Sequence, residues 1–248
     1  MENARSALSI SIIIPVFNEG KHLVNMIEAI RGTDNVKEIL LIDDCSKSEF
    51  AVLYDTIKGV TVIHRPENGG KDKSILTGYE RSSGDYILIL DGDLIGLTRS
   101  HLNALQKHLP EYQIIRMTRG DDYAIAKFFG LTYITAGEHL VSREVIDKYK
   151  PVLFKEEEWS FEYELNGIIT GDPALKIKFC ELAGVRHIMK EKKYGFWTGL
   201  FLGTKMVSNV FVLKYKLIGY LLVYLSLHSY IRDREKIRPL EQNSNSST

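Results

Sequence analysis

The sequence predicts an α/β fold in which helices flank a mostly parallel sheet. Over the first hundred residues, short β-branched apolar runs alternate with segments of helical periodicity. Three polar residues, Asn18, Asp44 and Asp91, come just after apolar runs, and ligands of such sheets bind beyond the carboxyl ends of the strands. The chain has 248 residues, of which 44% are hydrophobic and 26% charged, and this composition is typical of a globular protein with a sizeable core.

The elements are predicted in order along the chain. Residues 8–16, LSISIIIPV, form a β-branched run that predicts a buried strand. Residues 19–31 place Leu23, Ile27 and Ile30 on one face of a helix. Further strands are predicted at 36–42, 60–64, 86–90 and 114–117, and a further helix at 71–82.

Ser46 follows the second predicted strand and is the expected N-cap of the next helix. Residues 100–172 are less regular, and 156–166 are acidic and aromatic. The last ten residues, PLEQNSNSST, are polar, and we expect them to be disordered.

The formal charge is balanced overall but uneven along the chain. Lys plus Arg and Asp plus Glu each number 32, and this balance excludes a generally basic nucleic-acid-binding protein. Residues 1–173 hold 19 basic and 27 acidic side chains, whereas residues 174–238 hold 13 basic and 4 acidic ones. The C-terminal quarter therefore differs from the rest in partner or location.

The cysteines and the N-terminus predict a cytoplasmic protein. Cys45 and Cys180 form no spaced cluster, so a disulfide framework and a thiolate zinc site are not expected. The apolar run near the N-terminus is short and soon meets Asn18 and Glu19, unlike a signal peptide.

Residues 206–231 are unusually apolar, with only Lys214 and Lys216 as strongly charged side chains. The longest uncharged stretch has 15 residues, shorter than the ~20 that span a bilayer. Basic residues flank it, which favours a helix lying on an anionic membrane surface. The alternative is a helix packed on the domain or on the second subunit of a homodimer.

Asp91-Gly92-Asp93 is the sharpest local signal. Two carboxylates two residues apart, after a buried strand, can share one divalent cation, and their oxygen atoms suit Mg²⁺ or Mn²⁺. Such a cation would neutralise a diphosphate leaving group. A tripeptide of this kind is also common in ordinary turns.

Asn68-Gly69-Gly70-Lys71 resembles a phosphate-binding loop at the start of a helix but is not a P-loop, because Arg65 and Asp72 stand where that motif requires Gly and Ser or Thr. No G-x-G-x-x-G follows the first strand, so a dinucleotide site is not expected.

Four spaced motifs carry a resemblance over residues 8 to about 100. They are I-I-I-P-V-F-N-E at 12–19, L-I-D-D-C-S at 41–46, N-G-G-K at 68–71 and G-D-Y-I-L-I-L-D-G-D at 84–93. In this order they resemble the nucleotide-sugar-binding half of family-2-type glycosyltransferases, whose fold is the Rossmann-like GT-A fold.

The resemblance implies a role for each motif residue in binding a nucleoside-diphospho-sugar. Pro15, Asn18 and Glu19 match the loop that lines the nucleobase and ribose, and Asp44 matches the carboxylate that hydrogen-bonds the base. Lys71 falls near the nucleotide.

Asp91, Gly92 and Asp93 match the D-x-D motif, which binds the donor and the metal. Asp93 is the expected direct metal ligand, and Asp91 is also assigned a catalytic role. The simpler interpretations are a shaped strand end at Pro15, a helix-start preference at Glu19, and an Asp43 that only caps and is solvated.

The second half carries fewer matches. Residues 137–144 resemble the G-E-x-x-x-x-R-E segment of some soluble members, and Glu162 lies where those members place an acceptor-side acidic residue. Glu162 is the candidate general base, which would take the proton of the attacking acceptor hydroxyl. Glu158 and Glu164 are rivals, and a solvated acidic helix face is the alternative.

His187 stands where similar transferases often place a further metal ligand, although a lone His is more often structural. Three lysines follow that could meet a diphosphate or an anionic acceptor: Lys190, Lys192 and Lys193.

The sequence departs from the motifs of two groups of similar transferases, and these departures narrow the expected activity. No glutamine begins the Q-x-x-R-W pattern of processive synthases, so we expect the transfer of one sugar. Ile95 stands where polyprenyl-phosphate transferases usually have Gln, which weakens assignment to that subgroup.

The expected organisation is a GT-A catalytic domain over residues 1–195, with a nucleotide-sugar half (1–98) and an acceptor half (99–195). An apolar, basic helical extension (196–238) and a disordered tail (239–248) follow.

The expected activity is metal-dependent transfer of one sugar from a UDP- or GDP-linked donor. The acceptor would be a lipid or lipid phosphate at the cytoplasmic face of the membrane, with the protein cytoplasmic or peripheral there. The alternatives are a soluble phosphorylated acceptor, a sugar-phosphate nucleotidyltransferase, and a non-catalytic nucleotide-sugar-binding subunit.

Overall fold

The computed structural model describes residues 8–119, 137–155, 160–188 and 235–237. The strands are β1 (Ile10–Val16), β2 (Val36–Asp43), β3 (Thr61–His64), β4 (Tyr86–Ile89), β5 (Leu94–Ile95), β6 (Ile114–Arg119), β7 (Glu138–Ser142), β8 (Ile177–Leu182), β9 (Arg186–His187) and β10 (Glu235–Ile237). The helices are α1 (Lys21–Ile30), α2 (Ser48–Asp55), α3 (Gly70–Arg81), α4 (Arg99–Gln106), α6 (Arg143–Leu153) and α7 (Ser160–Gly171).

Eight of the described strands form one sheet in the order β10-β8-β6-β7-β4-β1-β2-β3. β1 pairs parallel with β2 and β4, and β2 pairs parallel with β3. β7 runs antiparallel to both of its neighbours, β4 and β6, while β6, β8 and β10 are again parallel. This arrangement confirms the predicted α/β class with a mostly parallel sheet. β5 and β9 form a separate antiparallel pair.

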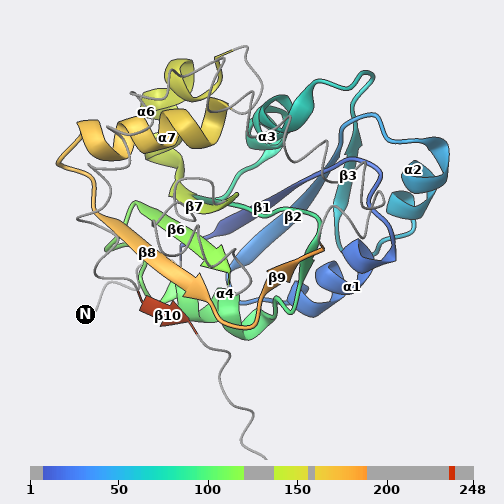
Figure 1. The fold of residues 1–248 in the computed structure, drawn as a ribbon, viewed down its shortest axis with the longest axis horizontal. Coiled ribbons are helices and arrows are strands. Elements are labelled where there is room, and N and C mark those ends of the chain that lie inside the picture. The colour runs from blue at the N-terminus through green and yellow to red at the C-terminus, as the bar shows by residue number, and fades with distance from the viewer. Residues whose placement is uncertain (1–7, 120–136, 156–159, 189–234, 238–248) are drawn as a thin grey trace, which may run out of the picture.

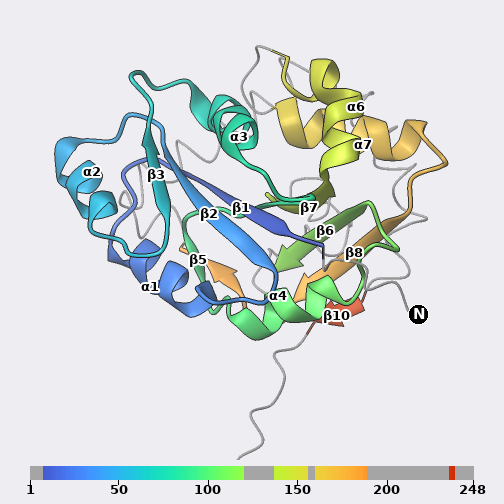
Figure 2. The same cartoon turned by 180° about the vertical axis from the view of Figure 1, so that it is seen from behind.

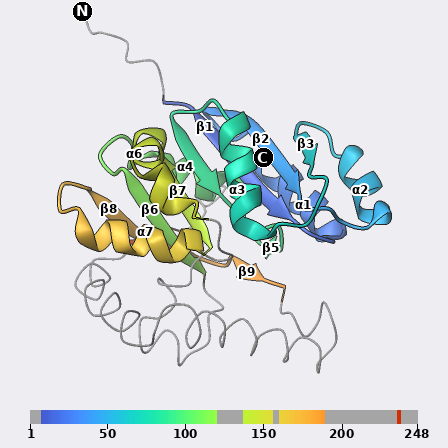
Figure 3. The same cartoon turned by 90° about the horizontal axis from the view of Figure 1, so that it is seen from above.

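Helices cover both faces of the sheet. Figure 1 shows α3, α6 and α7 on one side and α1 and α4 on the other, and Figure 2 shows the same layers from behind. Seen from above, α3 lies between the α6–α7 pair at one end and α2 at the other (Figure 3).

The apolar run of β1 supplies both cores. Ile12 and Ile14 pack in the cluster that includes the buried faces of α1 and α4, whereas Ile13 packs in the cluster with α3, α6 and α7. All three are fully buried. A strand covered on both faces needs a continuous apolar run rather than an alternating one, and the sequence of β1 has this form.

α1 buries the face that its periodicity predicts, including Leu23, Ile27 and Ile30. The helix begins at Lys21, two residues later than predicted, and Gly32 follows it with a φ of +80°. Glycine adopts this left-handed conformation without a Cβ penalty, so it is a common residue just beyond a helix.

Ser46 does not cap α2, so that prediction was wrong. The N-cap of α2 is Lys47. The Ser46 hydroxyl instead accepts a hydrogen bond from the backbone N–H of Asn18 at 2.8 Å, and thus joins the loops that follow β1 and β2.

The predicted C-terminal extension lies mostly outside the described residues. Its residues 235–237 form the edge strand β10, which pairs with β8; residues 206–231 are not described, and neither is the tail. Within the described part of the chain, no helix is both long and apolar enough to cross a membrane.

α3 lies close against the sheet at Gly78. A Cβ at this position would stand 2.6 Å from Cγ2 of Ile13, well inside normal contact. Because position 78 is glycine, α3 can pack close to β1. This distance in turn determines where the first turn of α3 lies relative to the sheet.

Gly78→Ala should lower the free energy of unfolding by about 1–3 kcal/mol in a urea titration, because the new methyl group overlaps Ile13. This loss outweighs the roughly 1 kcal/mol gained in helix propensity. Gly167→Ala is the matched control: it lies inside α7, where an added Cβ would meet nothing within 4 Å, and it should raise the free energy by up to about 1 kcal/mol. An equal response of both variants would contradict the close packing of α3.

Candidate active site

Side chains tie together the loops that follow β1 and β2. Asn18 has a φ of +56°, a conformation that Asn tolerates better than most residues. Its side-chain oxygen accepts from the backbone N–H of Lys47 at 2.9 Å, while its own N–H donates to Ser46. Asn18 therefore holds the two loops in one arrangement at the carboxyl edge of the sheet.

Pro15 and Glu19 lie on either side of this contact. Pro15 is half-buried within β1, opposite Ile42 of β2. Glu19 is buried; its N–H donates to the Tyr54 hydroxyl at 2.7 Å, and its carboxylate contacts His22 Nε2 at 2.7 Å. The nucleotide-binding roles predicted for these residues stay predictions.

The two carboxylates at the end of β2 are both buried and both bonded within the protein. Asp43 accepts from the Ser46 N–H at 2.9 Å and contacts His64 Nδ1 at 2.7 Å; it caps the loop, but it is not solvated as the alternative held. The Asp43 and Asp55 carboxylates together raise the pKa of His64, with Asp55 contributing most.

Asp44 binds the start of α3. Its two oxygens accept from the backbone N–H groups of Gly69 at 3.0 Å and Gly70 at 2.8 Å, and one of them also pairs with Arg65. Free N–H groups at a helix N-terminus attract carboxylates. Asp44 thus fixes where α3 begins, and its nucleobase role stays a prediction.

Lys71 stands in the first turn of α3 and joins the two halves of the site. Its Nζ lies 2.7 Å from Oδ1 of Asp91, which follows β4, and 2.9 Å from Oε1 of Glu162, which is in the first turn of α7. The Lys71 side chain is 13% exposed. Burial alone would lower the pKa of Lys71, but the two carboxylates outweigh it and hold that pKa above its usual range.

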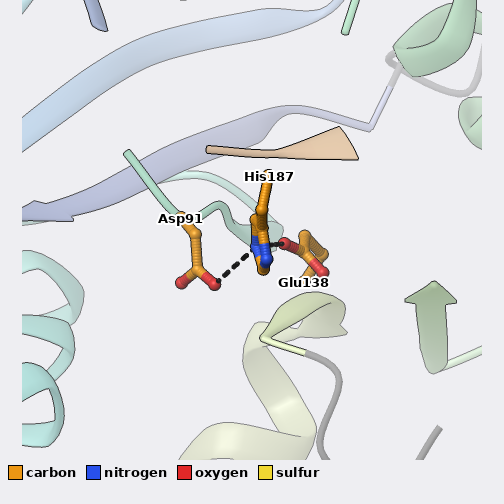
Figure 4. A group of neighbouring side chains, drawn as sticks. All are labelled: Asp91, Glu138 and His187. Atoms are coloured by element: carbon orange, nitrogen blue, oxygen red, sulfur yellow. Dashed lines mark ion pairs between the residues drawn. The ribbon is translucent and has the colours of Figure 1, made fainter. Parts of the chain in front are cut away.

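Asp91 also belongs to a cluster of three side chains. One donor atom from each of Asp91, Glu138 and His187 falls within 4.8 Å of the other two. His187 lies between the two carboxylates (Figure 4), with Nε2 at 3.5 Å from Oδ2 of Asp91 and 3.5 Å from Oε1 of Glu138. We call these three residues the acidic–histidine cluster.

The small β5–β9 sheet brings His187 to this place. Leu94 pairs with His187, and the N–H of Ile188 donates to the carbonyl of Asp93 at 3.1 Å. These backbone contacts hold β9 next to the residues that follow β4. His187 and the D-x-D motif, about ninety residues apart, therefore meet through backbone pairing.

Charged neighbours lower the pKa of Asp91 and raise the pKa of His187. Burial would raise the pKa of Asp91, but Lys71 and then His187 hold it well below its usual value. Burial would lower the pKa of His187, but Asp91 and Glu138 raise it to about 10. The two carboxylates therefore favour the charged form of His187.

Glu138 was not predicted as a site residue, although the motif that contains it was noted. It is fully buried at the start of β7, and one oxygen pairs with Arg119. Its other oxygen, Oε1, accepts no hydrogen bond from any described residue. The preceding residue, Gly137, leaves room for the cluster: a Cβ there would stand 2.5 Å from Oδ2 of Asp91.

Asp93 and Gly92 complete the motif. Oδ1 of Asp93 lies 3.7 Å from Nε2 of His187, so Asp93 borders the acidic–histidine cluster without being one of its three members. A Cβ on Gly92 would stand 2.8 Å from Cγ1 of Val16, so the turn packs against the end of β1. Direct ligation by Asp93 stays a prediction.

The structure separates the rival acidic residues near Glu162. Glu162 is largely buried and faces Lys71. Glu164 instead pairs with Lys155 at 3.2 Å and lines a groove between α6 and α7. Glu158, Lys190, Lys192 and Lys193 lie outside the described residues.

Comparison with known sequences finds a family match for part of the chain. Residues 11–113 match the family described as Glycosyl transferase family 2. The matched segment runs from β1 to the residue before β6 and contains Lys71 and the Asp91–Asp93 motif. This part of the chain is therefore similar to glycosyl transferase family 2.

Curated relatives match about a third of this chain. It is 34% identical over 89 residues to a glycosyltransferase of Streptococcus pneumoniae serotype 4, which covers 34% of the chain and 30% of that protein. It is 33% identical over 94 residues to an undecaprenyl-phosphate 4-deoxy-4-formamido-L-arabinose transferase of Pseudomonas paraeruginosa, which covers 34% and 28%. The matched part is thus under a third of each relative's length.

Solved structures share the fold of this chain. Glucosyl-3-phosphoglycerate synthase from Mycobacterium tuberculosis, crystallised with Mn²⁺, uridine diphosphate and glucosyl-3-phosphoglycerate, superposes with a TM-score of 0.59. The likeness covers 81% of this chain and 79% of that one at 16% identity. It confirms the predicted GT-A fold.

His187→Gln should weaken Mn²⁺ binding at least about tenfold in a calorimetric titration, because one of three converging donor atoms is removed. His64→Gln is the matched control, since His64 also lies between two carboxylates, Asp43 and Asp55, but belongs to no such group of three among the described residues. Equal Mn²⁺ affinities of His187→Gln and the unchanged protein would contradict a cation site at the acidic–histidine cluster.

Proposed function

We propose that the protein is a metal-dependent, non-processive glycosyltransferase that moves one sugar from a UDP- or GDP-linked donor to an acceptor. One observation carries the proposal. Asp91 belongs to the acidic–histidine cluster and also contacts Lys71, and Lys71 in turn contacts Glu162. Both Lys71 and Asp91 lie in the segment that matches glycosyl transferase family 2. Lys71 thereby contacts both the carboxylate assigned to the donor side, Asp91, and the carboxylate assigned to the acceptor side, Glu162.

The acidic–histidine cluster suits a divalent cation. Two carboxylates and an imidazole are ligands for Mg²⁺ or Mn²⁺, and the buried Oε1 of Glu138 accepts no hydrogen bond from the described residues. Asp91, Glu138 and His187 would hold the ion, with Asp93 beside them. When bound, it would neutralise charge on the departing nucleoside diphosphate.

The proposed general base is Glu162. Lys71 holds Oε1, while the buried Oε2 accepts no hydrogen bond from any described residue. That oxygen would take the proton of an acceptor hydroxyl as the hydroxyl attacks the anomeric carbon. As the new glycosidic bond forms, the bond to the diphosphate breaks, and the Lys71 ammonium next to Asp91 would stabilise the leaving charge.

The proposed acceptor is a lipid or lipid phosphate, with a soluble phosphorylated compound as the alternative. The Pseudomonas paraeruginosa relative is named for undecaprenyl-phosphate, and the Mycobacterium tuberculosis structures contain a phosphoglycerate compound. A phosphate group is common to both. Binding to an anionic membrane surface, or dimerisation through the C-terminal segment, stays a prediction because residues 206–231 lie outside the described part.

Glu162→Gln should lower kcat about a hundredfold or more while the KM for the donor stays within about twofold, because the base acts on the acceptor proton and not on donor binding. The assay follows nucleoside diphosphate released from UDP- and GDP-sugars with Mn²⁺, given a polyprenyl phosphate or a soluble phosphorylated acceptor. Glu164→Gln is the control, and its kcat should not change.

Loss of donor affinity in Glu162→Gln without loss of kcat would place the base elsewhere. Pyrophosphate formed from a sugar phosphate and a nucleoside triphosphate would instead indicate a nucleotidyltransferase. Donor binding without turnover under every acceptor would indicate a non-catalytic subunit.

A further inference from the structure

The N-terminus of α7 rests on a carboxylate from another helix. Oδ2 of Asp72 accepts a hydrogen bond from the backbone N–H of Phe161 at 3.3 Å. Phe161 is the second residue of α7, and Asp72 is in the first turn of α3. The first N–H groups of a helix have no partner within the helix and are satisfied by capping groups. Asp72 thus caps α7 from outside that helix.

Asp72 is a buried carboxylate and therefore needs stabilising contacts. The residue is 5% exposed, and Phe161 is fully buried. A buried carboxylate is costly unless it is bonded, and here the positive ends of two helices, α3 and α7, both favour it. The burial and the two helix starts together fix the distance between α3 and α7 at this point.

Consecutive residues of α3 hold the same turn of α7 in two ways. Asp72 binds the backbone at Phe161, and Lys71 binds the side chain of the next residue, Glu162. The start of α3 is itself held by Asp44 at the end of β2. A continuous set of contacts therefore leads from the sheet through α3 to Glu162.

We propose that Asp72 is a positioning residue that sets the place of Glu162 relative to Lys71 and the acidic–histidine cluster. The inference rests on the proposed function, in which Glu162 is the base. Asp72 touches neither sugar nor acceptor in this account; it orients the turn from which Glu162 projects. Geometry of this kind matters because small displacements of a catalytic group cost large factors in rate.

The test compares Asp72→Ala with Asp72→Asn and Ser142→Ala. Asp72→Ala should lower kcat by roughly tenfold to a hundredfold with the donor KM nearly unchanged, and Asp72→Asn, which keeps an acceptor oxygen, should recover most of the loss. Ser142 caps α6 by accepting from the N–H of Val145 at 3.3 Å. Its replacement by Ala also removes a side-chain cap from the start of a helix, here from within the same chain segment, and should lower the urea midpoint without lowering kcat.

A double variant isolates the route through Glu162. In a Glu162→Gln background, adding Asp72→Ala should lower kcat by less than about twofold, because the group that Asp72 positions is already disabled. A full additional loss in that background would show that Asp72 acts by another route and would overturn the proposal. So would a kcat loss in Ser142→Ala that equals the loss in Asp72→Ala.

Hydrogen exchange separates this inference from the proposed function. In Asp72→Ala the amides of residues 161–165 should exchange faster, whereas in Ser142→Ala the increase should fall at the start of α6. If the unchanged protein shows no turnover, the transferase proposal fails, yet exchange still reports whether Asp72 holds the start of α7. Unchanged exchange at 161–165 in Asp72→Ala would overturn the positioning role by itself.

Discussion

The contact on which the site depends is the Lys71 ammonium placed between Asp91 and Glu162. These two carboxylates come from distant parts of the chain, one after β4 and one in α7. A buried charge is stable only when it is paired and bonded, so one lysine with two carboxylates is a constraint on the whole arrangement. It requires α3 to begin at the carboxyl edge of the sheet and α7 to begin beside it.

The rest of the fold meets that requirement step by step. Gly78 lets α3 approach β1, and Asp44 binds the first N–H groups of α3. The β5–β9 pairing then lays His187 over the residues after β4. The positive charge on Lys71 and the carboxylates around His187 thus come to share one small, largely buried volume.

Local sequence patterns predicted most of the elements well, and three of the residues that they singled out lie close together. The apolar runs of β1 and β2 are buried on both faces, and Asp91, Lys71 and His187 do lie near one another. These patterns work because strand burial and the residues that follow strands are local properties. Ser46 was misassigned because a serine before a helix can equally bind a neighbouring loop, and only the tertiary contact with Asn18 decides.

The part that sequence did not predict depends on pairing between distant segments. Glu138 enters the acidic–histidine cluster because β7 is inserted antiparallel between β4 and β6, and no spacing rule in a single sequence predicts that insertion. The choice between Glu162 and Glu164 likewise depends on which face of α7 meets Lys71. The most direct measurement is an anomalous difference map from crystals grown with Mn²⁺ and a nucleoside diphosphate. A manganese peak among Asp91, Glu138 and His187 is the predicted result, and a manganese peak bound elsewhere would contradict it.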